Sequence, residues 1–183
     1  MGDNHRLSFN EMAPILKNVT VFSGLNDESL KLICEKCEVL DFDSGTVIIE
    51  ENTPATEIYI LLKGSVAIVL GLREEPFELL RFGCGNCLGE ASVIGIQKHS
   101  ASAITVEKST LLVLSRSILM EIFEIDKALF SLLILNIARE LARRLHHSNE
   151  LILKYRKGEL AMDVFDTHCI YRNSSVRGKK IKI

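Results

Sequence analysis

The sequence FDSGTVIIEENTPATEIYILLKGSVAIV, residues 42–69, consists of short apolar runs separated by turn residues. The runs are rich in Val, Ile and Leu, and several alternate between the two faces that a pleated strand presents. Turn residues occupy 52–54 (Asn-Thr-Pro) and 63–64 (Lys-Gly). Because apolar runs of this length bounded by turn residues are typical of strands, the segment predicts antiparallel β-structure.

The same pattern continues on both sides, from residue 38 to residue 115. The predicted strands are EVLDF (38–42), TVIIE (46–50), EIYILL (57–62), SVAIVL (65–70), FELLRF (77–82), SAITV (102–106) and LLVLS (111–115). About eight short strands at this spacing are typical of a sandwich or jelly roll. We therefore expect a mainly β fold with flanking helices, of the α+β class, built on a jelly roll of about eight strands.

Helical periodicity returns on both sides of the β region. Residues 24–37 predict a helix capped by Asn26 or Asp27, and residues 8–22 are expected to be helical in part. Residues 116–126 predict a short amphipathic helix. The jelly roll is therefore expected to have helices at both ends.

Residues 127–156 predict a single helix of roughly 45 Å, at 1.5 Å per residue. One face has spacings of four and three residues, which is typical of a coiled-coil seam. Its members are Ile134, Ala138, Leu141, Leu145, Ser148, Ile152 and Tyr155. A second face, expected to pack on the β domain, contains Leu129, Leu132, Leu133 and Ile137. The first face then remains for a homodimer; the alternative is a monomer that buries both faces.

The composition favours a cytoplasmic protein with one well-filled domain. The chain has 183 residues, 47% of them hydrophobic, and a net charge of −2, so no overall field favours nucleic acid or an anionic membrane. No apolar run approaches the ~20 residues of a membrane-spanning helix. Residues 1–12 contain no apolar signal-peptide core.

Four of the five cysteines form the pairs Cys34/Cys37 and Cys84/Cys87, with the CxxC spacing of metal and redox sites. The odd count suits reduced thiols, and the first pair falls in an apolar helical pattern. We therefore expect small core residues, with a metal or redox site as the alternative. The five histidines form no cluster typical of a metal-dependent enzyme, so we expect no catalytic activity, no metal and no cofactor.

Together these features resemble the cyclic nucleotide-binding domain family, from about Val21 to Tyr155. The matching segments are the entry helix (VFSGLNDESLKLI, 21–33), the first half-roll (42–69, with Gly45 and Gly64 at its turns), the start of the phosphate-binding cassette (FGCGNCLGEASVIG, 82–95), its exit strand (SAITVEKSTLLVLSR, 102–116) and the dimer helix of the catabolite activator protein and its relatives (ARELARRLHHSNELI, 138–152). The resemblance implies a jelly-roll sensor domain.

The resemblance also implies a site for a cyclic nucleotide, cAMP or cGMP, at the cassette. A short helix after Gly89 can offer backbone N–H groups to a phosphate. The small residues Ala91 and Ser92 let the backbone come close. On the family's pattern, Glu90 accepts a hydrogen bond from the ribose 2′-hydroxyl.

The sequence departs from the family at the arginine that neutralises the cyclic phosphate, in the motif Arg-x-Ala-Thr/Ser-Val. Aligning Thr105 and Val106 on the end of that motif puts Ser102 at the arginine position, followed by Ala103 and Ile104. This alignment implies an insertion of about two or three residues after the cassette glutamate. Losing one hydrogen bond to a charged group weakens binding roughly 10- to 150-fold.

Two substitutes for the missing arginine remain open. Lys98 or His99 could supply the positive charge, although lysine lacks the planar fork of arginine. Alternatively, Ser100, Ser102 and Thr105 could line a pocket for a neutral polar molecule, or the pocket binds nothing.

The long predicted helix also carries candidate ligand contacts. Ser148 and Asn149 occupy the positions of the hydroxyl pair that contacts the purine in the catabolite activator protein, and Arg144 precedes them at a matching distance. Ser148 also falls in the predicted dimer seam, where a polar residue can set the register. Purine contact and register setting both stay open.

The chain is expected to divide into a helical lead-in (1–20), a cyclic nucleotide-binding-like domain (21–156) and a basic tail (157–183). The tail ends in YRNSSVRGKKIKI, with five Lys or Arg and no acid, and predicts a solvated, flexible segment. A weak nucleic-acid or partner contact is the alternative. Because residues 157–183 show no two-helix pattern, we expect no DNA binding of the winged-helix kind found in the family's transcription factors.

These expectations combine into a non-catalytic, ligand-sensing regulatory domain. Ligand binding would shift the cassette and the long helix, and with them a dimer or partner surface. The competing hypothesis is a relative that binds no ligand and acts as a dimerisation or docking module of the same fold.

Overall fold

The computed structural model describes residues 7–157. Within them the chain forms α1 (Phe9–Leu16), η1 (Thr20–Phe22), α2 (Asp27–Lys36), β1 (Glu38–Phe42), β2 (Val47–Ile49), β3 (Glu57–Lys63), β4 (Val66–Leu70), β5 (Phe77–Phe82), β6 (Cys87–Leu88), α3 (Glu90–Gly95), β7 (Ser102–Thr105), β8 (Ser109–Ser115), α4 (Arg116–Ile125) and α5 (Lys127–Arg156). The predicted basic tail, apart from Lys157, lies outside the described residues.

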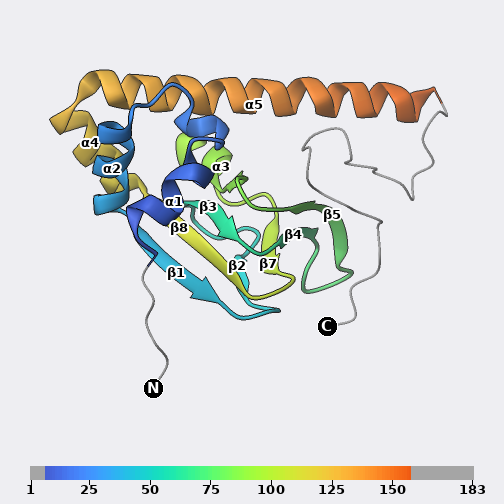
Figure 1. Cartoon of the computed structure of the whole chain (residues 1–183). Helices are drawn as coiled ribbons and strands as arrows, with labels where there is room; N and C mark the ends of the chain where they lie inside the picture. Colours follow the sequence, from blue (N-terminus) through green and yellow to red (C-terminus); the bar gives the residue numbers. More distant parts are fainter. Residues whose placement is uncertain (1–6, 158–183) are drawn as a thin grey trace.

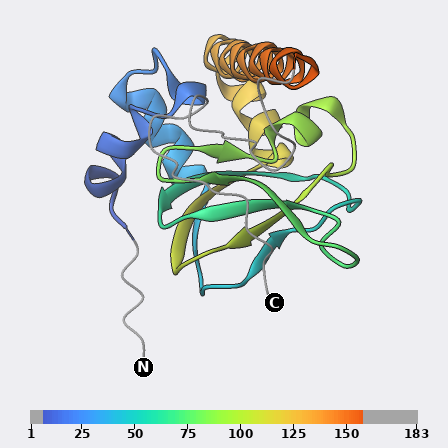
Figure 2. The ribbon, with the colours of Figure 1, turned by 90° about the vertical axis from the view of Figure 1, so that its right-hand side faces the viewer.

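The strands form two sheets of four antiparallel strands, with the orders β1-β8-β3-β6 and β2-β7-β4-β5. The sheets lie face to face below the helices (Figure 2). This arrangement confirms the predicted jelly roll with flanking helices. Seven of the eight strands correspond to segments that the sequence predicts. Strand β6 is the exception, because it is only two residues long and lies in a glycine-rich segment.

The helices form a layer on one side of the sheets, and α5 runs across the top of the molecule (Figure 1). Asn26 caps α2 as predicted, because its Oδ1 accepts a hydrogen bond from the Ser29 backbone N–H at 2.8 Å. Three of the four residues of the predicted inner face of α5, Leu129, Leu133 and Ile137, are buried in the core that the helices share with strands β3 and β8. The fourth, Leu132, is half-buried.

One buried amide attaches α5 to the N-terminal segment. The Asn136 side chain donates hydrogen bonds to the Ser23 carbonyl oxygen at 2.7 Å and to the Val21 carbonyl oxygen at 3.3 Å. Asn136 is only 3% exposed, and its bond to Val21 is buried, whereas its bond to Ser23 is part-buried. Since losing a buried hydrogen-bond partner costs about 1–3 kcal/mol, this contact fixes the position of α5 along η1.

The exposed apolar face of α5 differs from the predicted seam. Ile134 and Leu141 are half-buried, and Leu141 packs against the core. Five exposed apolar side chains of α5 form a line with spacings of three, four, three and seven residues: Leu135, Ala138, Ala142, Leu145 and Ile152. Ala128 and Leu153 are also exposed but lie off this line. Ile134 and Leu141 of the predicted seam therefore turn partly towards the domain, since positions one residue apart lie about 100° apart around a helix. Ala138, Leu145, Ser148 and Ile152 of the seam are exposed.

None of the helices within residues 7–157 combines the length and apolarity that a membrane span requires.

Candidate ligand-binding pocket

The cassette turns sharply at Gly89, which adopts a left-handed backbone conformation with φ 85°. A Cβ at this position would lie 2.8 Å from the Glu57 carbonyl oxygen, too close for any other residue without backbone movement. The short helix α3 begins directly after this turn, as the sequence predicts. Gly89 therefore positions Glu90 at the start of α3.

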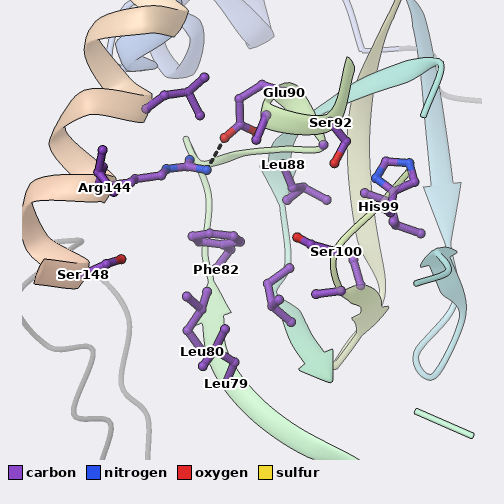
Figure 3. A pocket seen from close by; sticks show the side chains of 18 residues that line it. Leu79, Leu80, Phe82, Leu88, Glu90, Ser92, His99, Ser100, Arg144 and Ser148 are labelled. Atoms are coloured by element: carbon purple, nitrogen blue, oxygen red, sulfur yellow. Dashed lines mark hydrogen bonds and ion pairs between the residues drawn. The ribbon is translucent and has the colours of Figure 1, made fainter. Parts of the chain in front are cut away.

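A pocket of about 620 Å³ lies between α5, the cassette and the sheet β2-β7-β4-β5 (Figure 3). Its size falls within the ~300–1,000 Å³ typical of ligand sites, and its walls are mostly apolar, as such sites usually are. Eight of the twelve predicted site residues line it: Gly89, Glu90, Ala91, Ser92, His99, Ala103, Arg144 and Ser148. The fold thus brings the cassette and the long helix to one cavity.

The other four predicted residues do not line this pocket. The Ser102 hydroxyl accepts a hydrogen bond from the Glu51 backbone N–H at 3.0 Å, and the Thr105 hydroxyl donates to the Asp43 carbonyl oxygen at 2.6 Å. For Ser102 the reason is strand alternation, because Ala103 faces the pocket and its neighbour Ser102 therefore faces the other side of β7. Lys98 and Asn149 are exposed.

The sequence interpretation missed most of the apolar walls. The missed apolar residues are Ile49, Ile68, Leu79, Leu80, Phe82, Leu88, Ala101, Leu141 and Leu145. Ser100 also lines the pocket, whereas the sequence suggests it only for a neutral ligand. A helical signal was present in the sequence, because Leu141, Arg144, Leu145 and Ser148 are spaced at i, i+3, i+4 and i+7. These positions share one face of α5.

An ion pair closes the α5 end of the pocket. Arg144 reaches from α5 to the cassette, where its Nη1 contacts Glu90 Oε1 and its Nη2 donates to the Cys87 carbonyl oxygen at 2.9 Å (Figure 3). Its Nε donates to Glu140 Oε1 at 2.9 Å, and its guanidinium carbon lies 5.4 Å from the centre of the Phe82 ring. Arg144 is therefore held by contacts on several sides.

The protonation equilibria at this end follow from burial and from the arginines. Burial raises the pKa of Glu90, although the Arg144 charge acts in the opposite direction. The pKa of Glu140 is lowered, because hydrogen bonds and charge from Arg143 and Arg144 outweigh its burial. Burial also raises the pKa of Cys87 well above its usual range, with a further contribution from the Glu90 charge. The Cys87 thiol is therefore protonated and unreactive at neutral pH.

One oxygen of Glu90 is left without a strong partner. Oε2 is buried, and no nitrogen or oxygen donor among residues 7–157 gives it a hydrogen bond; the adjacent Cys87 thiol is a weak donor. A buried carboxylate oxygen in this condition is costly, because the lost hydration is not replaced. Glu90 Oε2 can therefore accept a hydrogen bond from a ligand hydroxyl.

The opposite end of the pocket contains His99 (Figure 3). Its backbone is held on both sides, because its N–H donates to the Thr53 carbonyl oxygen at 2.9 Å and its carbonyl oxygen accepts from the Asn52 N–H at 2.8 Å. The imidazole is 8% exposed, and its Cε1 would lie 3.7 Å from a Cβ at Gly89. His99 therefore lies beside the cassette turn.

The CxxC pairs do not contribute to the pocket walls. Burial raises the pKa of Cys34 to about 11 and that of Cys37 to about 12. Both thiols pack in or against the helical core, as a small apolar residue does. Within residues 7–157, no group of three or more His, Cys, Asp or Glu side chains is placed to hold a metal ion.

Comparison with known families accounts for this geometry. Residues 39–126 match the cyclic nucleotide-binding domain family. Within this chain, residues 39–126 are therefore the segment that matches a cyclic nucleotide-binding domain. The family resemblance that the sequence predicted is thus confirmed. The matched residues include the whole cassette from Gly89 to Thr105, whereas α5 lies beyond them.

Curated relatives carry this domain within larger proteins. A potassium channel protein of Rhodopseudomonas palustris is 30% identical over 110 residues, which are 60% of this chain and 26% of that protein. A cGMP-dependent protein kinase of Plasmodium berghei is 26% identical over 128 residues, 68% of this chain and 14% of the kinase. The chain spans about a quarter or less of the length of these relatives.

Solved structures share the fold over a longer stretch. The catabolite activator protein of Thermus thermophilus is 28% identical, with a TM-score of 0.65, over 73% of this chain and 62% of that chain. A cyclic nucleotide-binding domain from Methylobacillus flagellatus KT has a TM-score of 0.71 over 80% of this chain and 83% of its own, at 21% identity, which shows the fold alone. The cyclic nucleotide-binding fold is consistent with a ligand-sensing regulatory domain.

Proposed function

We propose that this chain is a non-catalytic regulatory domain that binds a cyclic nucleotide, cAMP or cGMP, in the pocket between the cassette and α5. The buried, weakly satisfied Oε2 of Glu90 is the observation that carries the proposal. A ribose hydroxyl in the pocket would donate to this oxygen and relieve the cost of its burial. The apolar walls and the pocket volume suit a base and sugar.

His99 is the group that we assign to the phosphate. The alignment through Thr105 requires an insertion of about two or three residues, and an alignment three residues earlier removes the need for it. The segment His99-Ser100-Ala101-Ser102 then matches the family motif Arg-x-Ala-Ser, with histidine in place of arginine. The lining of the pocket supports this register, because His99, Ser100 and Ala101 all line it and Ser102 does not.

The same contacts would transmit binding to α5. Glu90 is the first residue of α3, and Arg144 of α5 contacts it directly. A ligand hydroxyl that binds the Glu90 carboxylate competes for its charge and changes the restraint on Arg144. The ligand therefore shifts the position of α5 relative to the cassette, which is the output of the domain.

Isothermal titration calorimetry with cAMP and cGMP tests the binding proposal. We expect a dissociation constant near or below ~10 μM, about −7 kcal/mol, for one of the two nucleotides. Glu90→Gln should weaken binding at least tenfold, whereas Glu124→Gln, at an exposed position on α4, should not. Absence of heat at millimolar concentration of both nucleotides, with the protein folded, would refute the proposal.

The second candidate function is a dimerisation module that binds no nucleotide. The observation in its favour is the exposed apolar line on α5, with Leu145 63% and Ile152 60% exposed. Two such helices could pack along this line, with the small Ala138 and Ala142 allowing a close approach. A homodimer is compatible with either function. Dimerisation together with an absence of nucleotide binding would therefore favour the dimerisation module.

Light scattering after size-exclusion chromatography tests the dimer. We expect a dimer for the parent chain and a monomer for Leu145→Lys. Leu153→Lys is the matched control, because Leu153 is also exposed but lies about 100° around the helix from Ile152. Equal masses for the two lysine variants would show that this line is not the interface.

A further inference from the structure

The pocket contains only a few charged or titratable groups. Among the described residues that line it, they are Glu90, His99 and Arg144. Arg144 is already bonded to Glu90, to Glu140 and to the Cys87 carbonyl oxygen. His99 is different, because its imidazole makes no hydrogen bond to any other residue that the structure describes. The positive charge available to an incoming anion is therefore that of a protonated His99.

The acidic side chains around His99 are engaged elsewhere. In the adjoining loop, Glu50 pairs with Arg73, and Glu51 accepts a hydrogen bond from the Gly71 N–H at 3.0 Å. Glu57 of β3 accepts from the Tyr59 hydroxyl at 2.5 Å.

On the other elements around the ring, Glu90 of α3 pairs with Arg144, and the neighbouring Lys98 is exposed. No acid among these stabilises an imidazolium, and burial lowers the pKa of His99 below 6.5. The side chain is therefore mostly neutral at neutral pH until an anion enters the pocket.

We propose that binding of a phosphodiester anion in this pocket is coupled to the protonation of His99, so that the complex takes up one proton that the free protein lacks. The inference rests on the proposed function and adds its regulation by pH. The proton comes from the buffer and is bound by a ring nitrogen, and no covalent bond to the ligand forms. An arginine at the same position would not titrate, and the site would then be insensitive to pH.

The direction of the effect follows from linkage. A bound phosphate favours the imidazolium, so the pKa of His99 is higher in the complex than in the free protein. Between these two pKa values, affinity increases as pH falls, by up to about tenfold per pH unit. Above the higher value the imidazole stays neutral in the complex, and below the lower value it is protonated in both states, so affinity is flat in both ranges.

Calorimetry of the full chain in two buffers of different ionisation enthalpy, Pipes and Tris at pH 7, measures the proton directly. With cAMP and cGMP as the probes, the observed heats should differ between the buffers, and affinity should rise severalfold between pH 8 and pH 6. His99→Arg should bind with the same affinity at both pH values and equal heats in both buffers. Lys98→Gln is the matched control and should behave as the parent chain does.

The outcomes separate the two proposals. Binding with equal heats in both buffers and no pH dependence would overturn the proton coupling and leave nucleotide binding in place. No heat for either nucleotide between pH 6 and pH 8 would overturn the proposed function, and the coupling with it. A pH dependence that persists unchanged in folded His99→Arg and in folded His99→Gln would assign the proton to another group and refute the role of His99.

Discussion

The two ends of the pocket differ in whether their charged or titratable side chains are paired. At the α5 end, Arg144 forms ion pairs with both Glu90 and Glu140. At the β7 end, the His99 imidazole has no ion-pair or hydrogen-bond partner among residues 7–157, although the His99 backbone is hydrogen-bonded on both sides. Paired charges give the first end rigidity and couple it to a helix. On the proposal above, a single titratable ring would give the second end a response to ligand and pH.

The largest effect is expected from breaking the fixed end. Arg144→Leu leaves the Glu90 and Glu140 carboxylates without their shared partner, and we expect a loss of about 3 kcal/mol in the free energy of unfolding, measured by urea denaturation. The double variant Arg144→Leu/Glu90→Gln should recover part of that loss, because one uncompensated charge is removed as well.

Arg156→Leu is the control for this experiment. Arg156 is exposed near the end of α5, so its replacement should change stability by less than about 0.5 kcal/mol. An equal loss from Arg144→Leu and Arg156→Leu would mean that the ion pair adds no measurable stability.

The next effect concerns Gly89, which connects the two ends. Gly89→Ala combines a left-handed backbone with a contact of 2.8 Å to the Glu57 carbonyl oxygen. We expect about 2 kcal/mol lower stability in urea denaturation, together with weaker nucleotide binding. Gly45→Ala is a matched control for the backbone conformation, since Gly45 also has positive φ (82°) but a Cβ there meets no atom within 4 Å. If both variants lose the same stability, the contact with Glu57 is unimportant.

A smaller effect is expected at Ser102, on the outer side of β7. Ser102→Ala removes the acceptor for the Glu51 N–H and should cost about 1 kcal/mol of stability. Because Ser102 does not line the pocket, nucleotide affinity should stay within about twofold of the parent value. A tenfold loss of affinity in calorimetry would support the alignment that puts Ser102, rather than His99, at the family's arginine position.

The smallest effect is on stability against pH without added nucleotide. Because burial holds the pKa of His99 below 6.5 in the folded state, the unfolded chain binds its proton first as the pH falls. The contribution of His99 to stability is therefore present above pH 6.5 and decreases as the pH falls towards the folded pKa. Urea denaturation between pH 7.5 and pH 5.5 should show a shallower decrease for His99→Gln than for the parent chain, and parallel curves would contradict this.

Much of the fold could be predicted because local patterns and tertiary structure agree. The predicted strands 38–42 and 77–82 and the long helix 127–156 have the same bounds in the structure. Apolar alternation and helical spacing each extend over several residues, so their signals are strong. Strand β6 has two residues and forms through pairing with Tyr59 and Ile60 of β3, which is a long-range contact that no local pattern contains.

The site was harder to predict because it depends on register. Glu90 and Arg144 both line the pocket, since the cassette turn and the continuous helix fix their positions, and their contact with a ligand stays a prediction. His99 and Ser102 lie on an irregular loop and a strand, where a shift of one residue moves a side chain to the opposite face. Aligning the loop backwards from Thr105 favoured Ser102, and only the three-dimensional arrangement shows which side chains meet in the pocket.

Asn136 is a fixed point near the N-terminal third of the long helix α5. Its two hydrogen bonds to the η1 segment oppose sliding of the helix along its axis, so a rotation of α5 on ligand binding would have its pivot near this residue. Arg144 lies about 12 Å from this pivot along the helix and Arg156 about 30 Å, at 1.5 Å per residue. A displacement of about 1 Å where Arg144 meets the cassette would thus become about 2.5 Å at the end of α5. A sub-ångström change in the pocket would become a movement that a partner surface can detect.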